Sequence, residues 1–289
     1  MDTPDPGTPS HYELSRRAAL AALAAAGGYA LAADPVLAQA IKTDDKGLVV
    51  GTVNVAGADG TPIPVYEAYP DQAGEYPVIV VISEVWGLHE WIKDVVRRFG
   101  KEGYYAVAPE LFSREGGLAQ VTDMQKVLSV VFNAPLKRVV GDLRAGAEYA
   151  RKQPAARADR IGVTGFCWGG QMTLTFPAFY KDTKAAVAWY GPPSRAHKDD
   201  PKPIAALDVA AEVPCPVLLL YGEADQGIPV ADVDKEEAAL KAAGRTVEKH
   251  VYPAAPHGFL ADYRPSYRAD AAKDAWGKCL AWFQKYLKA

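Results

Sequence analysis

Residues 161–170 read Ile-Gly-Val-Thr-Gly-Phe-Cys-Trp-Gly-Gly. A short apolar run leads into a Gly-x-Cys-x-Gly turn, and the residues that follow have helical spacing. This is the pattern of a sharp strand-to-helix turn with a nucleophile at its tip, where glycines let two backbone segments approach closely. We therefore predict that Cys167 is a catalytic nucleophile. The alternative is a buried structural cysteine in a glycine-rich turn.

Short apolar runs alternate with longer amphipathic stretches on both sides of this turn. The alternation predicts an α/β fold with a mostly parallel central sheet and helices on both of its faces. The all-apolar run at 78–82 predicts a central strand, and the Asp59-Gly60 turn favours an antiparallel edge. The remaining expected strands are residues 51–55, 64–69, 105–108, 161–164, 186–190, 217–221 and 247–252, and the expected helices are 92–102, 136–153, 170–179, 231–243 and 269–287.

Two residues that follow predicted strands complete a catalytic set with Cys167. His257 lies in the loop directly after the last strand, where it is placed to act as the base, and His197 is a second candidate. Asp225 follows the strand at 217–221 and is placed to orient the base, although Glu223 competes for that role. The order nucleophile, acid, base along the chain is that of α/β-hydrolases.

The surroundings of Cys167 also have predictable electrostatics. The helix beginning after Cys167 favours a thiolate through its dipole, and the backbone N–H of Trp168 is placed to face a developing oxyanion. Glu84 ends an all-apolar strand, and a carboxylate in such a place is costly unless it is paired or functional. A solvated acid at the end of a strand is the alternative for Glu84.

From about Thr61 to its end, the sequence resembles the dienelactone hydrolases, or carboxymethylenebutenolidases. The resemblance rests on Ser83-Glu84-Val85-Trp86-Gly87, Gly103-Tyr104, Pro109-Glu110-Leu111-Phe112, the turn at 165–170, Gly222-Glu223-Ala224-Asp225 with Pro229, and His257-Gly258-Phe259. It implies an α/β-hydrolase fold and hydrolysis of a small-molecule lactone or carboxylic ester through a Cys-His-Asp triad and an acyl-enzyme. It also implies that Glu84 contacts the resting thiol and releases it when substrate binds, and that the backbone N–H of Val85 is the second oxyanion donor.

One feature of that family is missing here. Its members grip a substrate carboxylate with two arginines, and the first of these positions, four residues after the histidine, is Ala261. The second segment offers only Arg114. We predict substrate contacts from Trp86 and Arg114, with Arg264 and Arg268 left open. An esterase or amidase acting on another acyl substrate, and a non-catalytic binding protein of the same fold, remain alternatives.

The first forty residues differ in composition from the rest. Ser15-Arg16-Arg17 precedes an apolar run at 18–33, and Ala38-Gln39-Ala40 supplies the small residues that a signal peptidase accepts. We predict a twin-arginine export signal at 1–40, cleaved after Ala40, and a single periplasmic or secreted domain at 41–289. With the signal removed, no stable membrane insertion is expected; a retained tether is the alternative.

Charge and cysteine content restrict the partners. The 289 residues carry a net charge of -3 with no concentration of Lys and Arg, so we expect no nucleic-acid partner. The histidines and cysteines show no metal-ligand spacing, so we expect neither a metal nor a cofactor. Cys215 and Cys279 are typical of small core residues, with a disulfide between them as the alternative. We expect a monomer or a small homo-oligomer.

Overall fold

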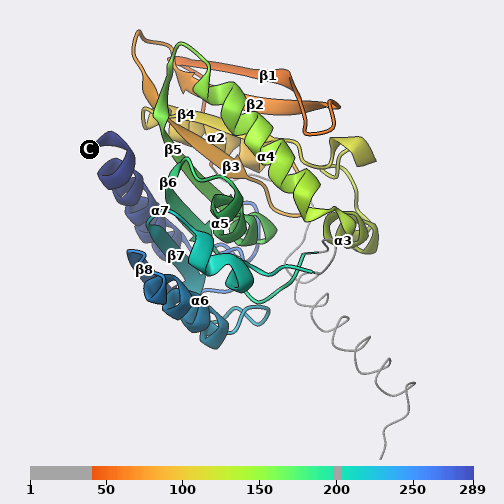
Figure 1. Cartoon of the computed structure of the whole chain (residues 1–289), viewed down its shortest axis with the longest axis vertical. Helices are drawn as coiled ribbons and strands as arrows, with labels where there is room; N and C mark the ends of the chain where they lie inside the picture. Colours follow the sequence, from red (N-terminus) through yellow and green to blue (C-terminus); the bar gives the residue numbers. More distant parts are fainter. Residues whose placement is uncertain (1–40, 198–202) are drawn as a thin grey trace, which may run out of the picture.

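A computed structural model describes residues 41–197 and 203–289, in which eight strands form one sheet. Along the sheet their order is β1-β2-β4-β3-β5-β6-β7-β8 (Figure 1). The pairs β1–β2 and β2–β4 are antiparallel and the other neighbours are parallel, which confirms the predicted sheet and its antiparallel edge. The strands are β1 (Leu48–Ala56), β2 (Pro62–Pro70), β3 (Tyr76–Ile82), β4 (Tyr105–Pro109), β5 (Ala156–Phe166), β6 (Thr183–Trp189), β7 (Val217–Gly222) and β8 (Val247–Tyr252).

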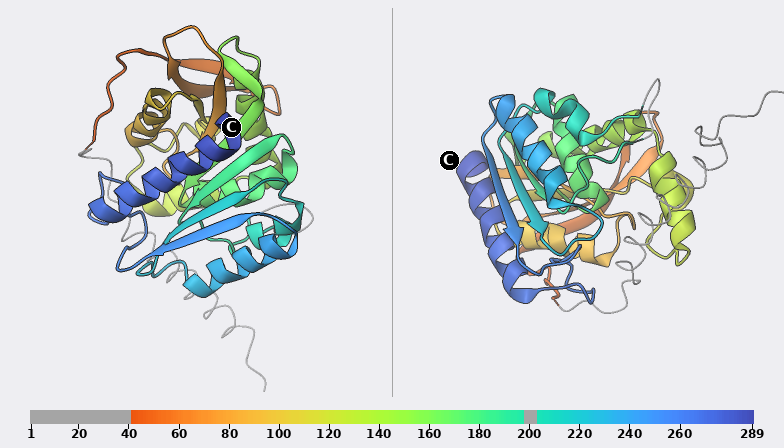
Figure 2. Two further views of the ribbon diagram at one scale, coloured as in Figure 1. Left: turned by 90° about the vertical axis from the view of Figure 1, so that its left-hand side faces the viewer. Right: turned by 90° about the horizontal axis from the view of Figure 1, so that it is seen from below.

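Helices cover both faces of the sheet, as the sequence predicts. Three of them lie on one face: α4 (Leu136–Arg151), α5 (Trp168–Phe179) and α6 (Val230–Ala242). The other face is covered by α2 (Glu90–Lys101) and α7 (Ala269–Phe283), which ends in the short π-helical turn η3 (Gln284–Lys288) (Figure 2). The sequence did not predict α3 (Met124–Asn133), in which Val127 and Val131 are buried.

The register of the sheet determines which residues meet at its carboxyl edge. In β3 every residue from Val78 to Ile82 is fully buried, as expected for a strand covered on both faces. Ile82 pairs with Gly165 of β5, and Phe166 pairs with Trp189 of β6. The strands therefore end at the same level, and the residues that follow them emerge side by side.

Two parts of the chain depart from this layered pattern. The connection after β6 contains an antiparallel bridge between His197 and Ile204, followed by the 3-10 helix η2 (Ala206–Glu212). The export signal predicted at 1–40 lies outside the described residues. Within 41–197 and 203–289, no helix combines the length and apolar character needed to cross a bilayer.

Candidate active site

Cys167 occupies a strained turn between β5 and α5. Its φ of 58° and ψ of -119° are unusual for a residue with a side chain, and such strain concentrates at functional sites. A Cβ on Gly165 would lie 2.3 Å from the carbonyl oxygen of Gly169, and a Cβ on Gly169 would lie 2.3 Å from that of Ile82. Both positions therefore require glycine, and the turn packs directly against the end of β3.

A hydrogen bond joins the side chains of His257 and Asp225. The Nδ1 of His257 lies 2.7 Å from Oδ2 of Asp225, and both residues are buried. The other carboxylate oxygen accepts from the backbone N–H groups of Gly227 at 2.9 Å and Ile228 at 3.2 Å. Because both oxygens of Asp225 are held, the imidazole has a fixed orientation with Nδ1 toward the acid.

The protonation of His257 is coupled to Cys167. Burial opposes a charge on the imidazole, but the charge of Cys167 and the hydrogen bond with Asp225 outweigh burial and raise the pKa of His257 to about 10. A side-chain hydrogen bond with Cys167 acts in the same direction. The arrangement therefore favours a protonated imidazole at His257 beside Cys167 at neutral pH.

The competing candidates for acid and base lie elsewhere. Glu223 is exposed. His197 is buried with its ring edge-on to that of Trp168, at 5.7 Å between centroids. Burial and the charge of Arg195 lower the pKa of His197 to about 4, so this imidazole is neutral at pH 7 and is not paired with Asp225.

Glu84 is completely buried just beyond β3 and is paired with three side chains. Its Oε2 accepts from the hydroxyl of Tyr263 at 2.6 Å and from Nη2 of Arg264 at 2.9 Å, and it lies 3.5 Å from Nε2 of His89. Burial raises the pKa of Glu84, but the charge of Arg264 and the contacts with His89 and Tyr263 outweigh burial and lower it to about 2. The described contacts of Glu84 thus run to these groups and not to the thiol that the resemblance implies.

The sequence is similar to those of known proteins. The model of the dienelactone hydrolase family matches residues 63–287. The chain belongs to the dienelactone hydrolase family. It is 47% identical over 277 residues to a Methylorubrum extorquens AM1 protein provisionally named carboxymethylenebutenolidase, with 94% of each chain covered. A protein of the same provisional name from Escherichia coli K12 is 40% identical over 261 residues, covering 90% of this chain and 95% of the relative.

A solved structure of this family agrees with the fold. The crystal structure of a Klebsiella pneumoniae protein, provisionally named dienelactone hydrolase, superimposes with a TM-score of 0.78 at 40% identity. The match covers 83% of this chain and 99% of that chain. The α/β-hydrolase fold and the family resemblance predicted from the sequence are therefore confirmed.

Arg264 interacts electrostatically with Cys167. Burial opposes its charge, but Glu84, Tyr263 and Cys167 outweigh burial and raise the pKa of Arg264. Arg268 is exposed and donates to the backbone oxygens of Pro265 and Tyr267.

Two acidic side chains hold Arg114 at the edge of the sheet. Its Nη1 lies 2.6 Å from Oδ2 of Asp142, and its Nη2 lies 2.7 Å from Oδ1 of Asp59. These two carboxylates hold the guanidinium against the turn at Gly57, because a Cβ on Gly57 would lie 2.6 Å from Nη2. These contacts stabilise the edge of the sheet, and a contact between Arg114 and substrate stays a prediction. Trp86 is buried in the loop that carries Glu84 and Val85, and it stays a candidate.

Three residues of the site were missed from the sequence. Tyr263 and His89 both contact Glu84. Tyr190, at a φ of 38°, follows β6 directly, and its ring lies edge-on to His257 at 5.1 Å between centroids. The rule that chemistry gathers at the carboxyl ends of strands was a usable signal for Tyr190. Tyr263 and His89 carried no such signal, because they come from loops whose paths depend on packing.

The three cysteines are free and buried, so Cys215 and Cys279 do not form the disulfide that the sequence left open. Burial raises the pKa of Cys215 to about 12 and that of Cys279 well above its usual value. Neither thiol is therefore activated. Among residues 41–197 and 203–289, no three His, Cys, Asp or Glu side chains are grouped to hold a metal ion.

The coupling between Cys167 and His257 predicts how stability depends on pH. A histidine whose pKa rises from about 6.5 in the unfolded chain to about 10 in the fold contributes stability that is complete below pH 6.5. That contribution is lost as the pH rises through 10. Melting curves of the native protein and of Cys167→Ala between pH 6 and 10.5 should therefore converge at high pH. Parallel curves for Cys167→Ala would contradict the coupling.

Proposed function

We propose that the protein hydrolyses a lactone or carboxylic ester by two-step acyl transfer on Cys167. The observation that carries this proposal is a cysteine at positive φ on a strand-to-helix turn, with an imidazole held by a buried carboxylate and coupled to the thiol. These are the parts of a nucleophile, base and orienting acid. The provisional names of the relatives, carboxymethylenebutenolidase, support an ester or lactone as the substrate.

In the first step, the thiolate of Cys167 attacks the carbonyl carbon and the carbonyl oxygen becomes an oxyanion. Trp168 is the first residue of α5, where a backbone N–H has no partner within its helix. The N–H of Val85 donates no hydrogen bond to the described residues. We assign both groups to the oxyanion. When the C–O bond breaks, the imidazolium of His257 gives its proton to the leaving oxygen, and a thioester remains.

In the second step, neutral His257 takes a proton from water as the water oxygen attacks the thioester. The carbon–sulfur bond then breaks, the carboxylic acid product leaves, and the thiolate–imidazolium pair is restored. Glu84 is a weak base in this scheme because its pKa is about 2. We therefore propose that Glu84 influences Cys167 through its negative charge and does not accept the proton of the thiol.

Trapping the acyl-enzyme tests this proposal. The protein is mixed with 4-nitrophenyl acetate and the reaction is quenched in acid after short times. The protein is then digested, and the masses of its peptides are measured by mass spectrometry. We expect an added acetyl group on the peptide that carries Cys167, and faster turnover of esters and lactones than of the matching anilide. Acetylation confined to other residues would contradict the nucleophile, and faster turnover of the anilide would favour an amidase.

The same digest carries an internal control for chance modification. Cys215 and Cys279 are buried and have raised pKa values, so both should stay unmodified by the ester and by iodoacetamide at pH 7. Fast labelling of Cys167 alone is expected of a catalytic thiol. If Cys167 is also unreactive, the protein is a non-catalytic member of the fold.

A further inference from the structure

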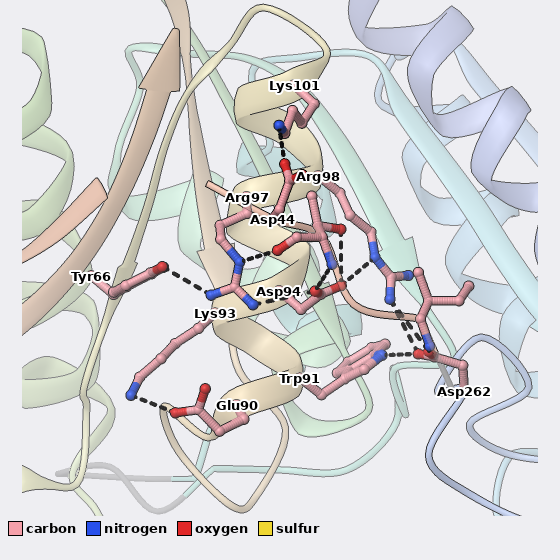
Figure 3. Close-up of polar contacts among 12 residues, drawn as sticks. Asp44, Tyr66, Glu90, Trp91, Lys93, Asp94, Arg97, Arg98, Lys101 and Asp262 are labelled. Atoms are coloured by element: carbon pink, nitrogen blue, oxygen red, sulfur yellow. Dashed lines mark hydrogen bonds and ion pairs between the residues drawn. The ribbon is translucent and has the colours of Figure 1, made fainter. Parts of the chain in front are cut away.

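The chain from Ile41 to Asp44 is held along α2 by specific contacts. The backbone N–H of Thr43 lies 2.6 Å from Oδ1 of Asp94, and its carbonyl oxygen accepts from Nε of Arg97 at 2.8 Å. The next residue, Asp44, pairs with Lys101 at 2.5 Å. Figure 3 shows this row of charged side chains along α2. The contacts fix the register of the segment and therefore the position of the Ile41 nitrogen.

The Ile41 nitrogen meets a buried carboxylate. It lies 2.6 Å from Oδ2 of Asp262, whose side chain is fully buried. The other oxygen of Asp262 accepts from Nε1 of Trp91 at 2.5 Å (Figure 3). Both of these short contacts come from neutral N–H groups.

The cation that pairs with Asp262 is shared with another acid. Nη2 of Arg98 lies 3.3 Å and 3.5 Å from the two oxygens of Asp262, whereas Nε of Arg98 makes a 2.6 Å bond to Asp94. Taking a carboxylate out of water is costly unless a cation compensates it closely. Asp262 is therefore placed to gain from a second cation, and the Ile41 nitrogen lies 2.6 Å away.

A cavity adjoins Ile41. It has a volume of about 420 Å³, and Ile41 forms part of its wall together with the apolar side chains of Leu260, Tyr267 and Trp276. Such a cavity can receive an apolar side chain while the backbone nitrogen beside it binds the acid. The charged groups that face the cavity are Arg98, Asp270 and Lys273.

We propose that the bond between Ala40 and Ile41 is cleaved and that the new α-ammonium group of Ile41 forms an ion pair with the buried carboxylate of Asp262. A signal peptidase adds water across this bond, so that Ala40 leaves as a carboxylate and the Ile41 nitrogen takes protons to become an ammonium. Ala38-Gln39-Ala40 has the small residues that such a peptidase accepts. One neutral N–H donor thereby becomes a charged group with three donors, which strengthens its bond to a carboxylate.

This ion pair acts on the catalytic centre through a short turn. Asp262 directly precedes Tyr263 and Arg264, which both hold Glu84. The turn is closed by a bond from the backbone N–H of Arg264 to the carbonyl oxygen of Ala261 at 3.0 Å. Asp262 is thus a positioning residue for Glu84. This catalytic part of the inference rests on the proposed function, whereas the ion pair itself does not.

The pH dependence of the pair has a defined sign. A free α-amine has a pKa of about 7.7–8.0 in an unfolded chain, and pairing with a buried carboxylate raises it. The added stability is therefore complete below pH 7.7 and is lost as the pH rises past the raised pKa. Arg98, Asp94, Asp270 and Lys273 face the pair in the cut and the uncut chain alike, so comparing the two forms removes their titration.

The experiment compares the full chain with the form processed in an export-competent bacterium. Intact mass should identify the processed form as residues 41–289. Its Tm should exceed that of the uncut chain by at least about 3 °C at pH 6.5, a shift that a single ion pair can produce in a domain of this size, and the gap should close by pH 9.5. A cut at another bond, or identical Tm profiles, would overturn the ion pair.

Variants assign the effect to one carboxylate. Asp262→Asn should remove the Tm gap between the two forms, whereas Asp270→Asn, at an exposed acid lining the same cavity, should preserve it. Loss of the gap in both variants would overturn the assignment to Asp262. The comparison of the two chain forms needs no substitution, so it decides the matter even if Asp262→Asn does not fold.

The catalytic part has its own measurements. The kcat for 4-nitrophenyl acetate and the rate of Cys167 alkylation should both be higher in the processed form, by at least about threefold, with KM little changed. Equal values in the two forms would overturn the positioning role of Asp262 while leaving the Tm result intact. If the protein hydrolyses no ester, the Tm and alkylation measurements still judge the ion pair.

Discussion

Cys167→Ala is expected to lower kcat for ester or lactone hydrolysis by at least about 10⁴-fold, because losing the nucleophile of a triad removes its whole concerted action. The fold should survive. Cys167 lies at a φ of 58°, which is as unfavourable for alanine as for cysteine, and the substitution removes one buried sulfur atom. Steady-state kinetics on the ester and lactone substrates, with circular dichroism as the check on folding, measure both effects.

Cys279→Ala is the matched control for this prediction. Cys279 is also a free, fully buried cysteine, but it lies in α7 away from the triad. Its replacement should lower stability slightly and leave kcat within about twofold, as for a substitution that touches no reacting atom. If Cys167→Ala retained the native rate, the acyl-transfer mechanism would have to be abandoned.

The second large effect is expected on stability, from Arg264→Met. Glu84 is completely buried, and Arg264 is the cation that does most to hold its charge. Removing one partner of a buried pair costs about 3–5 kcal/mol of unfolding free energy because the remaining charge is uncompensated. Urea denaturation at pH 8 measures this loss. At lower pH the loss should shrink, because protonation then neutralises Glu84.

Two further variants separate the charge from the packing. The double variant Glu84→Gln/Arg264→Met removes both charges and should recover most of the lost stability, since no buried charge is left alone. Arg268→Met removes an exposed guanidinium from the same segment and should change the unfolding free energy by less than about 0.5 kcal/mol. A double variant as unstable as Arg264→Met would show that shape, and not charge, dominates at this position.

The ion pair of Glu84 and Arg264 also determines how the stability of the native protein changes at acid pH. Glu84 has a pKa of about 2 in the fold, against about 4.3 in an unfolded chain. Its contribution to stability is therefore present above pH 4.3 and is lost as the pH falls toward 2. This acid-side loss complements the alkaline loss expected of His257.

The parts of the site that sequence could predict share one property. Cys167, Asp225 and His257 each follow a strand within a few residues, and parallel strands deliver such residues to one edge of a sheet. The position of each residue shortly after a strand therefore predicted that the three side chains would meet. The central strands β3, β4 and β7 could be predicted because burial on both faces leaves apolar runs in the sequence.

The surroundings of Arg114 and Arg264 could not be predicted from their distance to a strand. Arg114 was predicted to contact substrate because it lies close to β4, but two carboxylates from distant segments hold it at the edge of the sheet. Arg264 follows no strand closely. It reaches the site because the loop after His257 folds back over the end of β3 and brings Tyr263 with it.

By itself, the sequence determined the strand-to-helix turn at Cys167, the order of Cys167, Asp225 and His257 along the chain, and the alternation that builds the sheet. These features depend on local backbone geometry and on apolar periodicity, which neighbouring residues along the chain encode. Only the tertiary structure decided that Glu84 is held by Arg264, Tyr263 and His89, and that the Ile41 nitrogen lies against Asp262. Charges buried together come from segments far apart in the chain, and their pairing depends on loop paths that periodicity does not encode.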